Sequence, residues 1–301
     1  MFRLAHLSDV HLGPLPPVSF ADLASKRVTG YVNWRRNRAH RMMDNALDAL
    51  IADMLGQRPD HIAVTGDLVN LALDAEIETA RLWLDAIGDP PTVSVVPGNH
   101  DAYVPGALDK VKGAWAPYMY GDDHRGDGHA TFPYLRRRGS LALIGVTSAE
   151  ATAPFMAHGY FRGRQAVLTA DLLDRTRDEG LFRIVMIHHP PVRRATPMHK
   201  RLYGIGRFQK LVAEHGADLV LHGHTHLPTL HWIEGRDGRV PVVGVSAASE
   251  GFGGHRPPAS YNLLEISTEG NRPAVTLTRR GLTGMTAHID TLERLDLAEM
   301  R

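Results

Sequence analysis

Short apolar runs of strand length recur along the first three-quarters of the chain. They cover residues 2–9, 61–67, 92–96, 141–147 and 182–188, and a further run begins at Leu219 and stops at Gly223. Between them, apolar residues fall at helical spacing in segments 36–56, 74–88, 165–177 and 205–215. Strands that alternate with helices in this way predict parallel strands covered by helices on both faces.

The pattern changes after the Leu219 run. Helical spacing disappears, and the next strands are expected at residues 229–234, 240–247, 261–267 and 273–279, joined by polar turns. We therefore expect a second sheet packed against the first within one domain, residues 1–282. Three segments are expected to lie outside this pattern of strands and helices. They are an irregular stretch at 14–35, a long loop with one helical turn at 102–133, and a C-terminal tail or helix at 283–301.

The composition narrows the class of protein without naming a function. The chain has 301 residues, 43% hydrophobic and 22% charged, and its formal net charge is +1. These values are typical of a globular protein and give no general attraction to nucleic acid. The chain contains no cysteine, which excludes a disulfide framework and thiolate metal ligands. It has no signal-peptide-like apolar core and no run near the roughly 18 residues of a membrane span, so the expected location is the cytoplasm.

Chemically distinctive residues follow the strands of the predicted sheets. Five clusters each come directly after an apolar run: Asp9-Val10-His11, Gly66-Asp67, Gly98-Asn99-His100-Asp101, His188-His189 and His224-Thr225-His226. Ligand sites in open α/β sheets gather where loops leave the carboxyl ends of strands, so these clusters can converge. They offer carboxylate, imidazole and amide donors, which suit hard to borderline divalent metals. The set is too rich for one ion and predicts a pair about 3.5–4 Å apart.

Some of these residues also have simpler explanations. Asp67 alone could be a helix N-cap. His188 directly ends its strand and is favoured as the ligand, whereas His189 either faces the substrate or caps the turn before Pro190. Histidines inside strands are expected to be packed or to support the ligands: His6, His61 and His222.

The order Asp-x-His, Gly-Asp, Gly-Asn-His-Asp, His and Gly-His-x-His over residues 9–226 resembles the calcineurin-like metallophosphoesterases. The resemblance implies a four-layer α/β/β/α sandwich of two mixed sheets flanked by helices. It also implies two divalent metal ions, for which manganese is expected first, with iron and zinc as alternatives that suit the same donors.

The same resemblance implies a role for each matching residue. Three residues bind one metal: Asp9, His11 and His226. Three bind the other: Asn99, His188 and His224. Asp67 bridges the two ions, and a hydroxide shared between them attacks phosphorus. His100 lies over the substrate phosphate as a general acid, and Asp101 orients its ring.

Two basic segments without acidic residues follow the first and fourth clusters. One lies between Asp22 and Asp44 and carries Arg35 with Tyr31 and Trp34 interleaved, and the other, residues 180–213, carries Arg193. They predict a cationic rim around the metal pocket. The alternative is that these basic residues form an ordinary solvated surface. The expected substrate-binding residues are Asn99, His100, His189, Arg35 and Arg193.

The substrate is expected to be a phosphodiester. Residues 25–37 resemble a bacterial group that includes phospholipase C-type enzymes, which favours a membrane glycerophospholipid, with segment 23–41 in peripheral contact with the anionic inner membrane face. The alternative is a soluble diester, either a cyclic nucleotide or a glycerophosphodiester, because class III cyclic nucleotide phosphodiesterases carry the same motifs. A non-catalytic metal-bound scaffold is a further alternative, which the complete donor set and His100 argue against. No nucleic acid partner is expected, and the oligomeric state is left open.

Overall fold

The structure, a computed structural model, describes residues 1–37, 46–124, 129–253, 255–269, 273–284 and 287–297. The helices of this part of the chain are α1 (Phe20–Leu23), α2 (Arg27–Asn37), α3 (Ala46–Gly56), α4 (Asp74–Ile87), α5 (Ala107–Ala114), α6 (Gly163–Asp178) and α7 (Ile205–His215). The strands are β1 (Phe2–Leu7), β2 (His61–Val64), β3 (Val93–Val95), β4 (Tyr134–Arg138), β5 (Leu141–Gly145), β6 (Gly159–Tyr160), β7 (Phe182–Met186), β8 (Leu202–Tyr203), β9 (Leu219–His222), β10 (Leu230–Gly235), β11 (Gly238–Gly244), β12 (Ser260–Ser267), β13 (Ala274–Thr283) and β14 (His288–Asp296).

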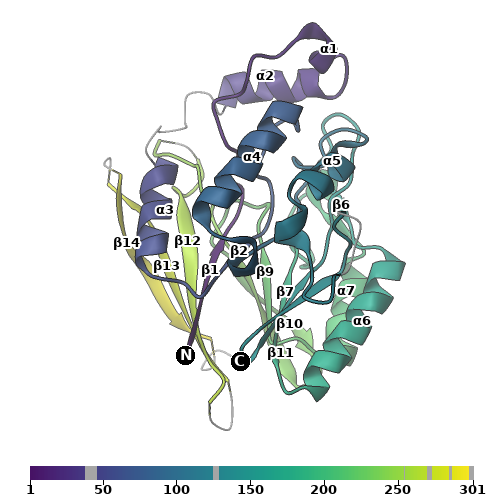
Figure 1. Cartoon of the computed structure of the whole chain (residues 1–301), viewed down its shortest axis with the longest axis vertical. Helices are drawn as coiled ribbons and strands as arrows, with labels where there is room; N and C mark the ends of the chain where they lie inside the picture. The colour runs from purple at the N-terminus through teal and green to yellow at the C-terminus, as the bar shows by residue number, and fades with distance from the viewer. Residues whose placement is uncertain (38–45, 125–128, 254, 270–272, 285–286, 298–301) are drawn as a thin grey trace.

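Two six-stranded mixed sheets form the centre of the molecule (Figure 1). The first has the order β14-β13-β12-β1-β2-β3, and β1, β2 and β3 are parallel. The second has the order β10-β11-β9-β7-β5-β4, with β11, β9, β7 and β5 parallel. The two mixed sheets flanked by helices that the sequence predicts are therefore confirmed.

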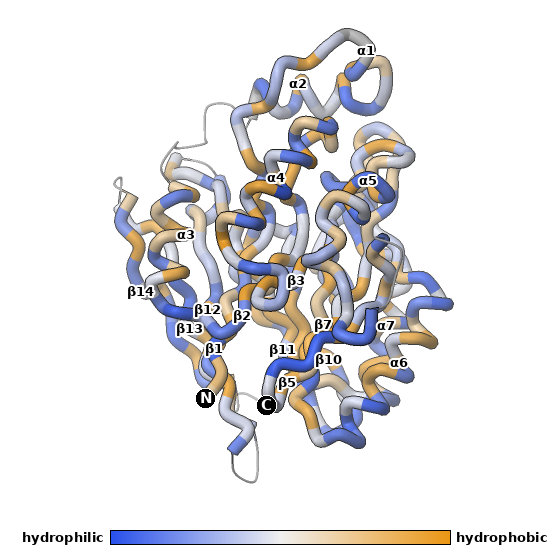
Figure 2. The backbone as a smooth tube through the Cα atoms, viewed as in Figure 1, coloured by the Kyte–Doolittle hydropathy of each residue, from blue (hydrophilic) through white to orange (hydrophobic). Residues whose placement is uncertain are grey.

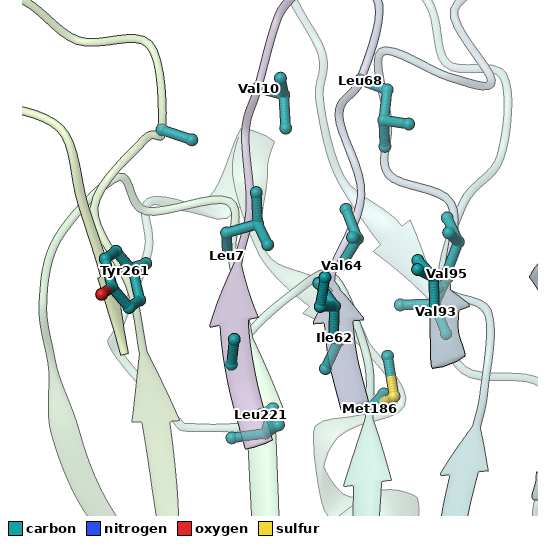
Figure 3. Close-up of a cluster of buried hydrophobic side chains, with 14 of the residues drawn as sticks. Leu7, Val10, Ile62, Val64, Leu68, Val93, Val95, Met186, Leu221 and Tyr261 are labelled. Carbon is teal, nitrogen blue, oxygen red and sulfur yellow. The ribbon is translucent and has the colours of Figure 1, made fainter. Parts of the chain in front are cut away.

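The central strands β7 and β9 of the second sheet are buried on both faces. Ile184 of β7 and Leu221 of β9 join the core that also holds the first sheet, whereas Val185 and Val220 join a separate core with Phe208 of α7. Successive side chains of a strand point to opposite faces, so this alternation assigns one face to the sheet–sheet interior and the other to the helices. Figure 3 shows the interior cluster, to which both sheets contribute side chains.

Helices cover the outer faces of both sheets. α6 and α7 lie against the second sheet, and α3 packs on β12, β13 and β14 of the first (Figure 1). Apolar and polar stretches alternate along α6, as expected for a helix with one buried face (Figure 2). α1 and α2 lie beyond one end of the sheets, next to the end of α4.

Several elements differ from the sequence-based expectation. The C-terminal tail or helix expected at 283–301 is wrong, because β14 pairs with β13 at the sheet edge. The stretch 14–35, expected to be irregular, contains α1 and most of α2, and the single turn expected within 102–133 is the eight-residue helix α5. α3 begins at Ala46, and residues 38–45 of the predicted helix 36–56 lie outside the described residues.

Strand β4 was not predicted, since its sequence Tyr-Leu-Arg-Arg-Arg is too polar to resemble a buried strand. The central guanidinium, of Arg136, is nevertheless buried. It donates to the carbonyl oxygens of Pro90, Val93, Pro117 and Tyr120 at 2.6–2.7 Å. A buried charge is tolerated when its donors are satisfied in this way, and the partners are too distant in sequence for the local pattern to indicate them.

Candidate metal centre

The five clusters meet where β1, β2, β3, β7 and β9 end. The loops after β1 and β2 are joined by main-chain hydrogen bonds, in which the Asp9 and His11 amides donate to Gly66 O and Asp67 O at 2.9 and 3.0 Å. Five candidate ligands adopt left-handed backbone conformations: Asp9, His11, Asp67, His224 and His226, with φ between 44° and 68°. Such conformations are unfavourable for residues with a Cβ atom, and they cluster at functional sites. Their concentration here supports a functional site at this end of the sheets.

The donor atoms gather in two groups that share Asp67. In the first, His226 Nε2 lies 3.1 Å and His11 Nε2 3.9 Å from Asp9 Oδ1. In the second, Asn99 Oδ1 lies 2.8 Å from His224 Nδ1 and 3.2 Å from His188 Nε2.

Asp67 Oδ2 lies between these groups, 3.9 Å from His11 Nε2 and 3.4 Å from His188 Nε2. The structure thus brings all seven predicted ligands together.

Three ring orientations show which nitrogen of each histidine faces the site. His11 Nδ1 lies 3.1 Å from Val69 O, His188 Nδ1 2.6 Å from Thr65 O, and His224 Nε2 2.8 Å from Lys200 O. A carbonyl oxygen only accepts, so these nitrogens carry the protons. In the neutral rings the opposite nitrogens direct lone pairs toward the other donors, an arrangement that suits a cation.

His226 differs from these three histidines. Its Nδ1 accepts a hydrogen bond from Arg256 Nη1 at 2.5 Å, which places the proton of a neutral ring on Nε2, toward Asp9. Binding a metal through Nε2 needs the opposite tautomer, and the Arg256 side chain must then shift. Asp9 Oδ1 is buried and faces both His226 Nε2 and His11 Nε2, so the donor set around it still fits a metal ion.

The electrostatics of the buried carboxylates also call for a cation. Burial raises the pKa of Asp67, but the neighbouring His188 and His100 outweigh it and hold this pKa well below its usual value. Burial lowers the pKa of His188, yet Asp67 and Asp9 raise it to about 9. Without a metal, His188 therefore carries a proton beside Asp67, and a divalent ion can take the place of that proton.

His100 is held beside the donor groups. Its backbone amide donates to Asp67 Oδ1 at 2.7 Å, and its ring Nδ1 donates to Asn70 O at 2.6 Å. Its ring stacks on Tyr103, with centroids 5.4 Å apart, and meets His11 edge-on at 4.8 Å. A ring nitrogen of His100 is close enough to His11 and Asp67 to be a donor as well, but Asn70 occupies Nδ1 and the two donor groups are complete without it.

The structure corrects the role of Asp101. Its carboxylate accepts hydrogen bonds from the backbone amides of Asp67, Leu68, Val69 and Gly98, at 2.8–3.3 Å. Burial and the charge of Asp67 raise its pKa to about 7. Asp101 therefore fixes the loop that carries Asp67, because it accepts amide donors that the loop leaves unpaired, while the main-chain carbonyl of Asn70 orients His100.

His189 lies behind the donors rather than among them. It is buried, its Nδ1 faces Ser148 Oγ at 2.8 Å, and its Nε2 donates to Ala157 O at 3.2 Å. It can be grouped with His188 and His224 by distance, but both of its nitrogens are engaged. Burial and the charge of His188 lower its pKa to about 3, so it is neutral.

A cavity of about 590 Å³ opens beside the donors. It is lined by His11, Asn99, His100 and His226 together with residues that the sequence did not single out, chiefly Lys26, Thr29, Gly30, Asn33, Tyr103, Lys200 and Arg256. Neither Arg35 nor Arg193, both predicted to bind substrate, is among the described residues that line this cavity. Arg35 Cζ lies 5.9 Å from the centre of the Tyr31 ring. Arg193 lines a separate cavity of about 600 Å³ with Arg194 and Arg201.

Two mixed sheets, with two groups of buried donors around one carboxylate, are consistent with a metal-dependent phosphoester hydrolase. Residues 2–228 match the family of calcineurin-like phosphoesterases, and the chain belongs to this family. A Synechococcus sp. protein named as a probable cyclic nucleotide phosphodiesterase is 26% identical over 230 residues, which cover 74% of this chain and 78% of that protein.

Solved structures share the fold. A dimetal phosphatase from Danio rerio superposes with a TM-score of 0.63 at 13% identity and 98% coverage of both chains. Purple acid phosphatase PPD1 from yellow lupin gives 0.51 at 14% identity, covering 93% of this chain and 51% of its own. Within the described residues, no helix is long and apolar enough to cross a membrane.

Proposed function

We propose that the protein hydrolyses small, water-soluble phosphodiesters at a centre of two divalent metal ions. The observation that carries this proposal is Asp67 Oδ2, which lies between two groups of buried donors. One or more members of each group line the cavity together with His100: His11 and His226 of the first, and Asn99 of the second. A carboxylate in this position can hold two cations together, because it offsets part of their mutual repulsion.

The proposed ligands follow the two donor groups. One ion would be held by Asp9, His11 and His226, the other by Asn99, His188 and His224, with Asp67 shared. When bound, the two ions would activate a water molecule at neutral pH and offset negative charge on the phosphoryl group. The donors suit manganese, iron and zinc, and manganese is the ion to test first.

His100 is proposed as the residue that acts on the substrate. The Asn70 carbonyl holds its Nδ1 proton, so Nε2 is the nitrogen available to the substrate. When the ring is protonated, Nε2–H can donate to a phosphoryl oxygen and then pass its proton to the leaving oxygen.

We favour a soluble diester over a membrane phospholipid, because part of the segment expected at a membrane surface lines the cavity. Thr29, Gly30 and Asn33 of α2 line the cavity, so this helix of the basic segment forms part of its wall. The Synechococcus relative, named for cyclic nucleotides, favours the same alternative.

Hydrolysis assays with the manganese-loaded protein test this proposal. The panel comprises bis-p-nitrophenyl phosphate, cyclic AMP, glycerophosphoethanolamine, and vesicles of phosphatidylethanolamine with phosphatidylglycerol. We expect turnover of soluble diesters. Hydrolysis confined to the vesicles would establish the phospholipid alternative, and a metal-loaded protein that hydrolyses none of them would be a scaffold.

A further inference from the structure

One cation in the cavity has no obvious structural counter-ion. Lys26 lies in the turn between α1 and α2 and is half-buried at the cavity wall. Its Nζ donates to Thr152 Oγ1 at 2.6 Å and to Met156 O at 2.9 Å, and it lies 4.6 Å from the centre of the Tyr103 ring. The same Tyr103 ring stacks on His100, so Lys26 belongs to the cavity in which His100 lies.

The charge of Lys26 is not neutralised within the described structure. An ammonium group has three N–H donors, and the two hydrogen bonds above go to uncharged oxygens. No carboxylate of the described residues forms an ion pair with it. Burial lowers the pKa of Lys26 to about 8, an effect that the more distant charge of Asp67 only partly offsets. The group therefore remains mostly protonated at pH 7, in a place where an anion would stabilise it.

The position of Lys26 is fixed before any ligand binds. The next residue, Arg27, donates from Nε to Leu71 O at 3.0 Å and from Nη2 to Ala72 O at 2.6 Å. One turn further, Gly30 packs so closely on Tyr103 that a Cβ atom there would overlap the phenol oxygen. These contacts hold the turn against the loop after β2, so little ordering of the lysine is needed on binding.

We propose that Lys26 is a substrate-binding residue, which donates its remaining N–H to an anionic oxygen of the phosphate-bearing substrate. This assignment rests on the proposed function, because it deepens the description of the same cavity. It gives the segment before β2 a role in selecting anionic substrates, although Arg27 and Arg35, described arginines of that segment, do not line the cavity.

Two substitutions separate charge from packing. Lys26→Met keeps most of the length and removes the charge, whereas Lys26→Arg keeps the charge. For bis-p-nitrophenyl phosphate we expect Lys26→Met to raise KM about tenfold or more, with kcat within about threefold, as for loss of a charged hydrogen bond. Lys26→Arg should return KM to within about threefold of the wild-type value. Lys210→Met, which removes an exposed lysine of α7, is the control for net charge.

Calorimetric titration with inorganic phosphate gives a readout that needs no turnover. In the manganese-loaded proteins, the phosphate Kd should rise about tenfold in Lys26→Met and recover in Lys26→Arg, with unchanged metal content and Tm. Equal KM and Kd in wild type and Lys26→Met would overturn the assignment. So would Lys26→Arg behaving like Lys26→Met, or Thr152→Val reproducing its effect, since the lysine would then act only as a tether.

The two proposals can fail separately. If the wild-type protein binds phosphate through Lys26 but hydrolyses no diester, the proposed function is wrong and the Lys26 assignment stands. If it hydrolyses diesters and Lys26→Met is unaffected, the Lys26 assignment alone is wrong. A wild-type protein that neither binds phosphate nor hydrolyses diesters would contradict both.

Discussion

At the scale of single residues, main-chain carbonyl groups determine what the imidazoles of the site can do. Val69, Thr65 and Lys200 accept from the outer nitrogens of three proposed ligand histidines, and Asn70 accepts from His100. Such partners fix the tautomer and the direction of the remaining nitrogen. The proposed ligand histidines and the proposed catalytic His100 therefore differ in what the inner nitrogen meets: a buried carboxylate or amide oxygen for the ligands, and the cavity for His100.

This difference leads to a prediction for His100→Gln. Removing the ring should lower kcat for bis-p-nitrophenyl phosphate by roughly 10²–10⁴-fold, the usual contribution of a general acid. Both metals should remain, because the two donor groups are complete without His100. Metal analysis of the purified variant beside the kinetics checks this. If the variant binds only one ion per chain, His100 is itself a ligand.

A second residue-scale prediction concerns acid stability and His61. This histidine is buried at the start of β2, and its Nε2 faces Ser94 Oγ at 2.7 Å. Burial, with the charges of Arg136 and Arg138, lowers its pKa to about 3. The unfolded chain binds a proton at this residue near pH 6.5 and the folded chain does not, so stability is lost as pH falls from 6.5 toward 3.

Each fully developed proton difference contributes about 1.4 kcal/mol per pH unit to the free energy of unfolding. His61→Gln should therefore show a shallower decrease in stability than wild type between pH 6.5 and 5. Urea denaturation of both proteins at several pH values measures this, and the metal-site contribution cancels in the comparison. Parallel curves for the two proteins would show that His61 does not carry the effect.

The convergence of the candidate ligands was predictable because each lies within a short motif at the end of an apolar run. Asp9, Asp67 and His224 are identified by their immediate neighbours in sequence. The partner that orients His100 was not predictable, since Asn70 acts through its main-chain carbonyl, a group that every residue has. Asp101 was assigned to His100 because the two are adjacent, whereas its carboxylate turns toward the amides of the preceding loop.

At the scale of elements, the docking of α2 depends on the absence of a side chain at position 30. A Cβ atom on Gly30 would overlap the Tyr103 hydroxyl and approach Leu71 Cδ2 to 2.6 Å. In an isolated helix, alanine would be more favourable than glycine by about 1 kcal/mol. Here the collision should outweigh that preference, because forced overpacking costs roughly 1–3 kcal/mol.

Gly30→Ala should therefore lower Tm and raise KM for bis-p-nitrophenyl phosphate, since α2 would move away from Tyr103 and take Lys26 with it. Gly56→Ala is the matched control: Gly56 also lies in a helix, α3, but a Cβ there meets no atom within 4 Å. That variant should keep its KM and lose no stability. If Gly30→Ala matches Gly56→Ala in both measurements, α2 is not docked as described.

Elements held by long-range pairing were the ones that the sequence could not indicate. β14 carries Asp290, Glu293 and Arg294 on an exposed sheet edge, so its own pattern does not resemble a buried strand. It forms because β13 supplies hydrogen-bond partners along its length. α2 has no apolar face from which a helix could be predicted. Its contacts with Tyr103 and with the loop after β2 stabilise it.

At the scale of the whole molecule, the candidate metal ligands come from both sheets. Asp9 and Asp67 follow strands of the first sheet, whereas His188 and His224 follow strands of the second. Metal ions shared by these residues would link both halves of the sandwich at one edge. Without metal ions, His188 is protonated, because the ionised Asp67 and Asp9 raise its pKa.

Metal removal should therefore destabilise the whole fold and not only abolish activity. An ion that binds the folded state alone adds about 2.7 kcal/mol when its free concentration is 100 times Kd. We expect chelation to lower Tm by several degrees and added manganese to restore it, as followed by calorimetry. Asp67→Ala is the decisive comparison, because it removes the carboxylate on which both donor groups converge: its Tm should not respond to manganese. If manganese raises the Tm of Asp67→Ala as much as that of the wild type, the ions bind elsewhere on the protein. Asp67 would then not be the carboxylate that two ions share.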